Sequence, residues 1–216
     1  MDVMAEGIVA PQVLADGSEA PMRLDRTGAV IMVEGHGRYY EAASRGNLFT
    51  AYAAAGAVTT VATSMTGLIL VNNSTTTKAA LQKIGGLILA TSASATGLVL
   101  AWFQVGAPGT KPGVGYGAST ATALTAVPNY LGGNLPQCGV YSAVNSTVGT
   151  PVPFKTLLHN TAAIAVTGED VGFQMDLEGS IIVPPGFGVC VAALGAATAA
   201  TSTVLDLSWE EIPLTL

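Results

Sequence analysis

The stretch SIIVPPGFGVCVAAL, residues 180–194, holds two uncharged apolar runs on either side of Pro184-Pro185-Gly186. Because proline fixes φ and glycine tolerates a positive φ, these three residues predict a sharp corner. Runs this short are typical of strands, and the proline pair interrupts any membrane-spanning helix. An isolated pair of strands is only marginally stable in water. We therefore expect a hairpin here, with its apolar side chains packed on an opposing sheet.

Short apolar runs of the same kind recur along most of the chain. The clearest is TVLDLSWEEI, residues 203–212, in which apolar and polar side chains alternate as they do in a half-buried strand. Further runs occupy residues 66–73, 78–90, 97–105, 154–160, 162–168 and 171–183. About eight strands and no amphipathic helix longer than two turns predict an all-β antiparallel sandwich, most simply a jelly roll.

Residues 84–103, IGGLILATSASATGLVLAWF, are long and uncharged enough to suggest a membrane span. Their centre, however, is a polar Ser/Thr/Gly cluster, which favours two strands around a loop over a helix. Trp102 and Phe103 then point to opposite faces of a strand, so only one of them can lie in the core. Gly85-Gly86 predicts a bulge or a bend, and a short helix is expected near residues 121–125.

Charge is scarce and unevenly placed. Only 10% of the 216 residues are charged, against about 25% in a typical globular chain. Eleven of the 22 charged residues lie at positions 1–45, and only four lysines fall between 46 and 168. That middle region either meets a membrane, has a Thr/Ser/Gly-polar surface, or is buried against neighbours, and we favour the last two together. We expect an N-terminal arm, residues 1–46, followed by a β-sandwich body, residues 47–216.

Several chemistries are disfavoured by composition. A net charge of −6 argues against nucleic-acid binding, which needs basic patches. The two histidines, His36 and His159, cannot supply a metal site of three histidines, and the sequence spacing around them supports no Ser-His-Asp triad. Cys138 and Cys190 form no metal or disulfide pattern and are expected to be free thiols, with Cys190 in the core. The glycine-rich residues 106–120 lack phosphate-loop spacing. We predict no enzyme, no catalytic residue, no metal and no cofactor.

Two groups of side chains leave a binding role open. Four acids have the oxygen ligands that Ca²⁺ prefers, but not EF-hand spacing, so a solvated acidic edge is expected. These acids are Glu169, Asp170, Asp176 and Glu178. Several aromatic side chains could form a platform for a glycan, although packing is the simpler expectation. These aromatic residues are Tyr39, Tyr40, Trp102, Phe103, Tyr116 and Tyr130.

Longer strings show a family resemblance. RTGAVIMVEGHGRYYEAASRGNLFTAYAAAGAVTT, residues 26–60, resembles the N-terminal region of structural proteins from tailed bacteriophages. LILVNNS (68–74), SIIVPPGFGVCVAAL and LSWEEIP (207–213) resemble the body of the same proteins, whereas residues 106–153 do not take part. The resemblance implies a jelly-roll virion component on the capsid surface, such as a capsid decoration (cement) protein or a related head or tail accessory. It also implies synthesis in the bacterial host cytoplasm and a trimeric assembly.

We therefore expect a structural virion protein whose partners are copies of itself and the major capsid protein or other virion subunits, without nucleic acid or membrane. An arm without its own core has to lie on such a partner, and tyrosine and arginine are enriched at interface centres. The arm residues expected to dock are Arg38, Tyr39, Tyr40, Glu41, Arg45 and Phe49. The alternative is the receptor- or glycan-binding head of a phage fibre. An enzyme would need convergent titratable groups, which the sequence lacks.

Overall fold

The computed structural model describes residues 39–88, 97–105, 122–145, 150–159, 171–194 and 201–214 of the 216-residue chain. The chain separates into two compact units, Met1–Tyr40 and Glu41–Leu216. Most of the expected arm, residues 1–46, lies outside the described ranges, so both the arm and its boundary stay predictions. The second unit, hereafter the body, carries all the described strands.

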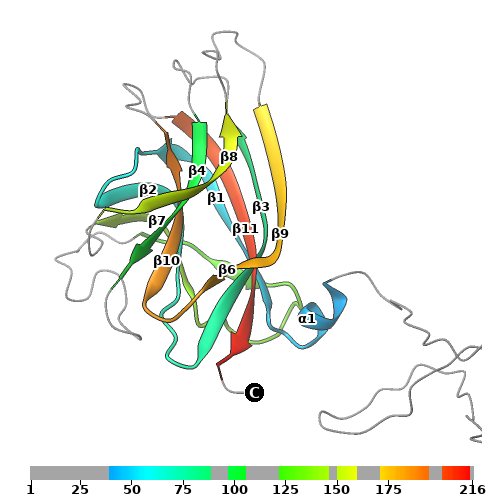
Figure 1. Ribbon diagram of the computed structural model, residues 1–216. Coiled ribbons are helices and arrows are strands. Elements are labelled where there is room, and N and C mark those ends of the chain that lie inside the picture. The colour runs from blue at the N-terminus through cyan, green and yellow to red at the C-terminus, as the bar shows by residue number, and fades with distance from the viewer. Residues whose placement is uncertain are drawn as a thin grey trace, which may run out of the picture. The chain divides into compact units, whose positions relative to one another are not determined.

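The body is an antiparallel β-sandwich of two sheets (Figure 1), and the all-β prediction is confirmed. One sheet has five strands in the order β6-β1-β11-β3-β9, and the other has six in the order β5-β7-β2-β10-β4-β8. The one short helix in the described ranges is α1 (Tyr40–Ser44). The strands are β1 (Leu48–Val58), β2 (Ser64–Val71), β3 (Thr77–Ile88), β4 (Gly97–Gln104), β5 (Thr122–Ala123), β6 (Ala126–Pro128), β7 (Gly139–Asn145), β8 (Val152–His159), β9 (Val171–Val183), β10 (Phe187–Ala193) and β11 (Thr201–Pro213).

The eight main strands pair from the outside of the sequence inwards. β1 pairs with β11, β2 with β10, β3 with β9 and β4 with β8, all antiparallel. Strands that follow one another in sequence, from β1 to β4 and from β8 to β11, alternate between the two sheets. The strands that pair within each sheet are therefore far apart in sequence, and most connections lead from one sheet to the other.

This topology corrects two predictions. β9 and β10, on either side of the Pro-Pro-Gly corner, lie in different sheets, and so do β3 and β4. Neither residues 180–194 nor residues 84–103 form a hairpin. The corner itself is confirmed, since Gly186 has φ 78° and Phe187 N–H donates to the Pro184 carbonyl at 3.2 Å. Apolar runs report that a strand is buried, but a tight corner can lead either to a neighbouring strand or to the facing sheet about 10 Å away.

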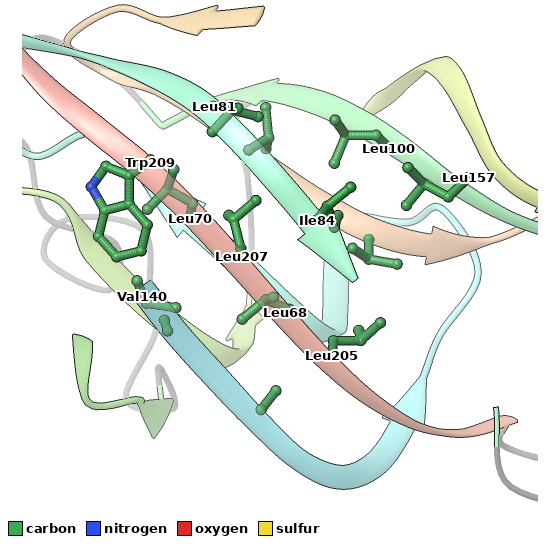
Figure 2. Close-up of a cluster of buried hydrophobic side chains, with 14 of the residues drawn as sticks. Leu68, Leu70, Leu81, Ile84, Leu100, Val140, Leu157, Leu205, Leu207 and Trp209 are labelled. Carbon is green, nitrogen blue, oxygen red and sulfur yellow. The ribbon is translucent and has the colours of Figure 1, made fainter. Parts of the chain in front are cut away.

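The core lies between the sheets. β11 alternates as predicted: Leu205, Leu207 and Trp209 are buried, while the residues between them face outwards. Figure 2 shows these side chains among those of Leu68 and Leu70 from β2. Each buried side chain of this size contributes about 1.5–3 kcal/mol. The row of alternating side chains on β11 therefore joins the two sheets into one folding unit.

The six-stranded sheet is apolar on both faces. Its face away from the main core carries a second buried cluster that includes Ile69, Phe103 and Cys190. Double burial explains why β2, β4 and β10 read as continuous apolar runs. Cys138 and Cys190 are both free, and Cys190 lies in the core as predicted, whereas the burial of Cys138 was not predicted. Within the described residues, no helix has the length and apolarity needed to cross a membrane.

Two local predictions are wrong. The bulge in β3 lies at Gln82, whereas Gly85 and Gly86 pair regularly with β11 and β9. The two glycines instead lie under close side chains, because a Cβ would come within 2.5 Å of the Asp206 carboxylate at Gly85 and within 2.7 Å of atoms of Leu205 and Phe173 at Gly86. The short helix expected near residues 121–125 is also absent. The described part of that segment is the edge strand β5, followed by Leu124, whose N–H donates to the Val140 carbonyl.

Candidate interaction surface

A buried asparagine holds the corner at which β9 crosses to β10. The Asn72 side chain is fully buried, and its amide donates to the carbonyls of Thr77 and Val183, both at 2.9 Å. Its side-chain oxygen accepts from Ser74 N–H at 3.0 Å. The Asn72 backbone also bonds to the corner, because its carbonyl accepts from Gly186 N–H at 3.0 Å. With its side-chain donors and acceptor used, Asn72 fixes the position of the corner relative to β2 and β3.

Beside this corner lies an apolar groove of about 380 Å³. Its floor is the edge of the main core, since Val183 and Val189 both belong to that core. Its walls come from four strands and the corner, and none of its lining residues is charged. The lining residues are Trp102, Phe154, Ile181, Ile182, Val183, Pro184, Phe187, Gly188 and Val189.

Large apolar side chains around this groove are open to solvent. Trp102 is 42% exposed, Phe154 44% and Ile182 50%. The rings of Trp102 and Phe187 contact each other with centroids 6.0 Å apart. Val152 at the start of β8 is exposed as well. Contiguous exposed patches of large apolar side chains commonly mark a site that binds a partner or a ligand.

The groove lies where the two sheets end side by side. β8 is the last described strand of one sheet and β9 the last of the other (Figure 1).

Both edges carry features that oppose further strand pairing. β8 contains Pro153, which has no N–H, and residues 177–180 of β9 bulge opposite the single Gln82. Glu178 at φ 52° and Gly179 at φ 72° form the bulge, which turns Leu177 into the core. Such bulges and prolines blunt sheet edges, so the groove favours side-chain insertion over strand addition.

A buried carboxylate fixes the loop that precedes β7. Glu211, on the buried face of β11, accepts from the N–H of Gln137 at 2.9 Å and of Cys138 at 2.9 Å. The indole N–H of Trp209 donates to the same carboxylate at 3.2 Å. Burial, and then the negative charge of Glu211, raise the pKa of the Cys138 thiol far above its usual range. Cys138 therefore stays protonated and unreactive, and the site is structural.

The outer face of the five-stranded sheet is polar. Tyr52, Asp206, Gly85 and Gln174 form one row across β1, β11, β3 and β9. A Cβ at Gly85 would lie 2.5 Å from the Asp206 carboxylate, so this carboxylate covers the glycine. Burial raises the pKa of Asp206, and the nearby charge of Lys83 opposes the rise. The exposed Tyr52 ring stands next to this carboxylate in the row.

The six predicted docking residues fall in different environments. Arg38 lies outside the described residues, and the side chain of Glu41 in α1 is not among those described. Tyr40 and Arg45 are exposed, and Tyr39 is partly buried. Phe49 is buried in the body, where its ring stacks on Trp209 at 5.9 Å. Its place in the core removes Phe49 from the exposed surface of this subunit, while docking by the others stays a prediction.

Among the described residues, the members of the other predicted groups do not gather into one site. Asp176 and Glu178 are exposed on β9, whereas Glu169 and Asp170 lie outside the described residues. No three His, Cys, Asp or Glu side chains gather into a possible metal site in the ranges that the structure describes. Trp102 is exposed and Phe103 buried, as the strand prediction required. Tyr116 and His36 lie outside the described ranges, and the side chain of His159 is not described.

Sequence reasoning missed the groove as a site. Its residues come from β4, β8, β9 and β10, which only the crossing connections bring together. One signal was present, because an aromatic residue that alternates with the buried Phe103 has to face the other side of β4. No protein-family model, curated protein or solved structure matches this chain. The meaning of the surface therefore rests on its own geometry and chemistry.

Proposed function

We propose that the body is a jelly roll. The support is the pairing order of its eight main strands. β1 pairs with β11, β2 with β10, β3 with β9 and β4 with β8, so the pairs are nested from the ends of the chain towards its middle. A long antiparallel ribbon rolled into two facing sheets produces this order, and jelly rolls are built this way from two Greek keys. β5, β6 and β7 then belong to the long connection between β4 and β8.

We further propose that the protein is a structural virion component, a capsid decoration (cement) protein of a tailed bacteriophage. In this role an oligomer, a homotrimer by the resemblance, binds the assembled shell. The observation that carries the proposal is the uncharged groove with three large half-exposed apolar side chains, on a chain that is only 10% charged. A protein that binds the assembled shell and not its free subunits stabilises the shell by mass action.

The test uses particles assembled without this chain. Purified protein is added to them, bound protein is measured after sedimentation, and the heat resistance of the particles is compared before and after addition. We expect saturable binding, many copies spread over the shell on particle imaging, and a higher disruption temperature. Absence of binding to shells, tails and fibres alike would overturn a role in the virion.

A receptor- or glycan-binding fibre head is the alternative. It is favoured by the outer face of the five-stranded sheet, where the exposed Tyr52 on β1 pairs with Asp206 on β11, in a row that ends at Gln174 on β9. Aromatic rings and carboxylate or amide groups are what a neutral sugar needs for stacking and hydrogen bonding. Glycan binding that is lost in Tyr52→Ala, with few copies at one position on the particle, would favour this alternative over a cement protein.

A further inference from the structure

We propose that the apolar groove receives residues 27–33, TGAVIMV, from a neighbouring copy of this chain. The inference rests on the proposed assembly function and names the contact that joins the copies. Trp102, Phe154 and Ile182 are exposed in the single chain, so the groove is open to a segment from elsewhere. Filling it would remove these side chains from water.

Neutrality of both surfaces is the first argument for this occupant. No lining residue of the groove is charged, and residues 27–33 hold no charge either. The surrounding sequence differs sharply, since eleven charges lie in residues 1–45. A charged segment buried against these rings would lose hydration without an ionic partner in the lining. The chain therefore supplies a segment that matches the groove in a region otherwise rich in charge.

Continuity of the apolar run is the second argument. Residues 29–33 are five consecutive apolar side chains, with three β-branched residues, Val30, Ile31 and Val33, among them. The other long uncharged stretch of this region, residues 7–15, is divided by Pro11. Since the groove walls are blunted against strand pairing, the side chains of the segment, rather than its backbone, make the contact.

The position of the groove on the body is the third argument. Leu48, Glu210, Ala80 and Ile182 form one row across β1, β11, β3 and β9. The first residue of β1 and the groove residue Ile182 are thus three strand spacings apart, about 14 Å. The residues that precede β1 enter the body at the same end of the sandwich as the groove. Copies that meet at this end bring the groove of one next to the chain entry of another.

A cysteine pair tests the contact in the full-length protein. Ile31→Cys and Ile182→Cys are combined, the protein is oxidised at pH 8, and the products are separated without reductant. Burial leaves the native thiols unreactive, because it raises the pKa of Cys190 to about 12 and that of Cys138 further still. We expect covalent multimers from the double variant and none from either single variant. A disulfide within one chain, or no disulfide in the folded oligomer, would overturn the proposal.

A second measurement avoids cysteine chemistry. Ile31→Asp places a charge in the segment, Ile182→Asp places one in the groove, and Val9→Asp is the matched control in the other uncharged stretch. Light scattering at fixed concentration should give a lower mass for the first two variants and an unchanged mass for the control. Equal masses for all three variants would overturn the contact.

Shell binding separates this inference from the proposed function. If the groove variants keep their oligomeric mass and still bind particles, the segment–groove contact is wrong while the virion role stands. If the double cysteine variant forms the cross-linked multimers but the unsubstituted protein binds no particle, the contact stands and the virion role falls. If cross-linking between copies fails, and shells change the tryptophan fluorescence of the unsubstituted protein but not that of Trp102→Phe, the groove binds the shell and this inference is wrong.

Discussion

Replacing Glu211 should strongly destabilise the body. Its carboxylate accepts three N–H groups, from Gln137, Cys138 and Trp209, at 2.9–3.2 Å. Glu211→Ala leaves these three donors without an acceptor, at about 1–3 kcal/mol each, so we expect a loss of about 3–9 kcal/mol. Glu211→Gln keeps one acceptor oxygen but turns charged hydrogen bonds into neutral ones, and we expect a loss of about 2–3 kcal/mol.

The assay is denaturant unfolding at one fixed protein concentration, followed by tryptophan fluorescence, to which the buried Trp209 and the exposed Trp102 both contribute. A fixed concentration is needed because assembly adds to the apparent stability. The matched control is Glu210→Gln, since Glu210 is half-buried on the opposite face of β11 and bonds only one side chain among the contacts identified, that of Gln82 at 3.2 Å. The control should change stability by less than about 0.5 kcal/mol. If Glu211→Ala unfolds within that same margin of the unsubstituted protein, the assignment of Glu211 as a structural anchor is refuted.

Three further predictions concern close packing and titration. Gly188→Ala places a Cβ 2.5 Å from the Phe103 ring and 2.8 Å from the Leu70 carbonyl, so the free energy of unfolding by denaturant should fall by about 1–3 kcal/mol. The control is Gly172→Ala, whose Cβ lies 3.7 Å from its nearest atom and should leave stability nearly unchanged. Burial raises the pKa of Cys138 and Cys190, so above about pH 9 the folded chain keeps two protons that the unfolded chain loses. The free energy of unfolding should therefore fall there by about 1.4 kcal/mol per pH unit for each thiol. A slope that is unchanged in Cys190→Ala would contradict this expectation. Because burial raises the pKa of Asp206, ionisation of this carboxyl group weakens the fold as pH rises through the carboxylate range. Asp206→Asn should therefore raise the melting temperature at pH 7 and not at pH 3. The opposite pH pattern in calorimetry would refute the burial argument.

Strand content and local corners could be predicted from the sequence because they depend on neighbouring residues. Alternation along residues 203–212 correctly placed Leu205, Leu207 and Trp209 on one face. The same period of two also places Glu211 on that face, which is the signal by which this buried acid could have been found. The turn at residues 184–186 followed from the restricted φ of proline and the freedom of glycine.

Strand partners and the groove were decided by the tertiary structure alone. An apolar run reveals that a strand is buried, but its hydrogen-bonding partner lies far away in sequence, as β1 pairs with β11 and β3 with β9. Phe49 shows the same principle. The sequence places it next to the arm and predicts an exposed docking residue, but the pairing of β1 with β11 packs its ring against Trp209 in the core. Trp102, Phe154 and Ile182 share one surface only because the chain crosses between the sheets at each corner. Burial of a strand is a property of its own side chains, whereas a shared surface is a property of long-range pairing, and the second requires the fold.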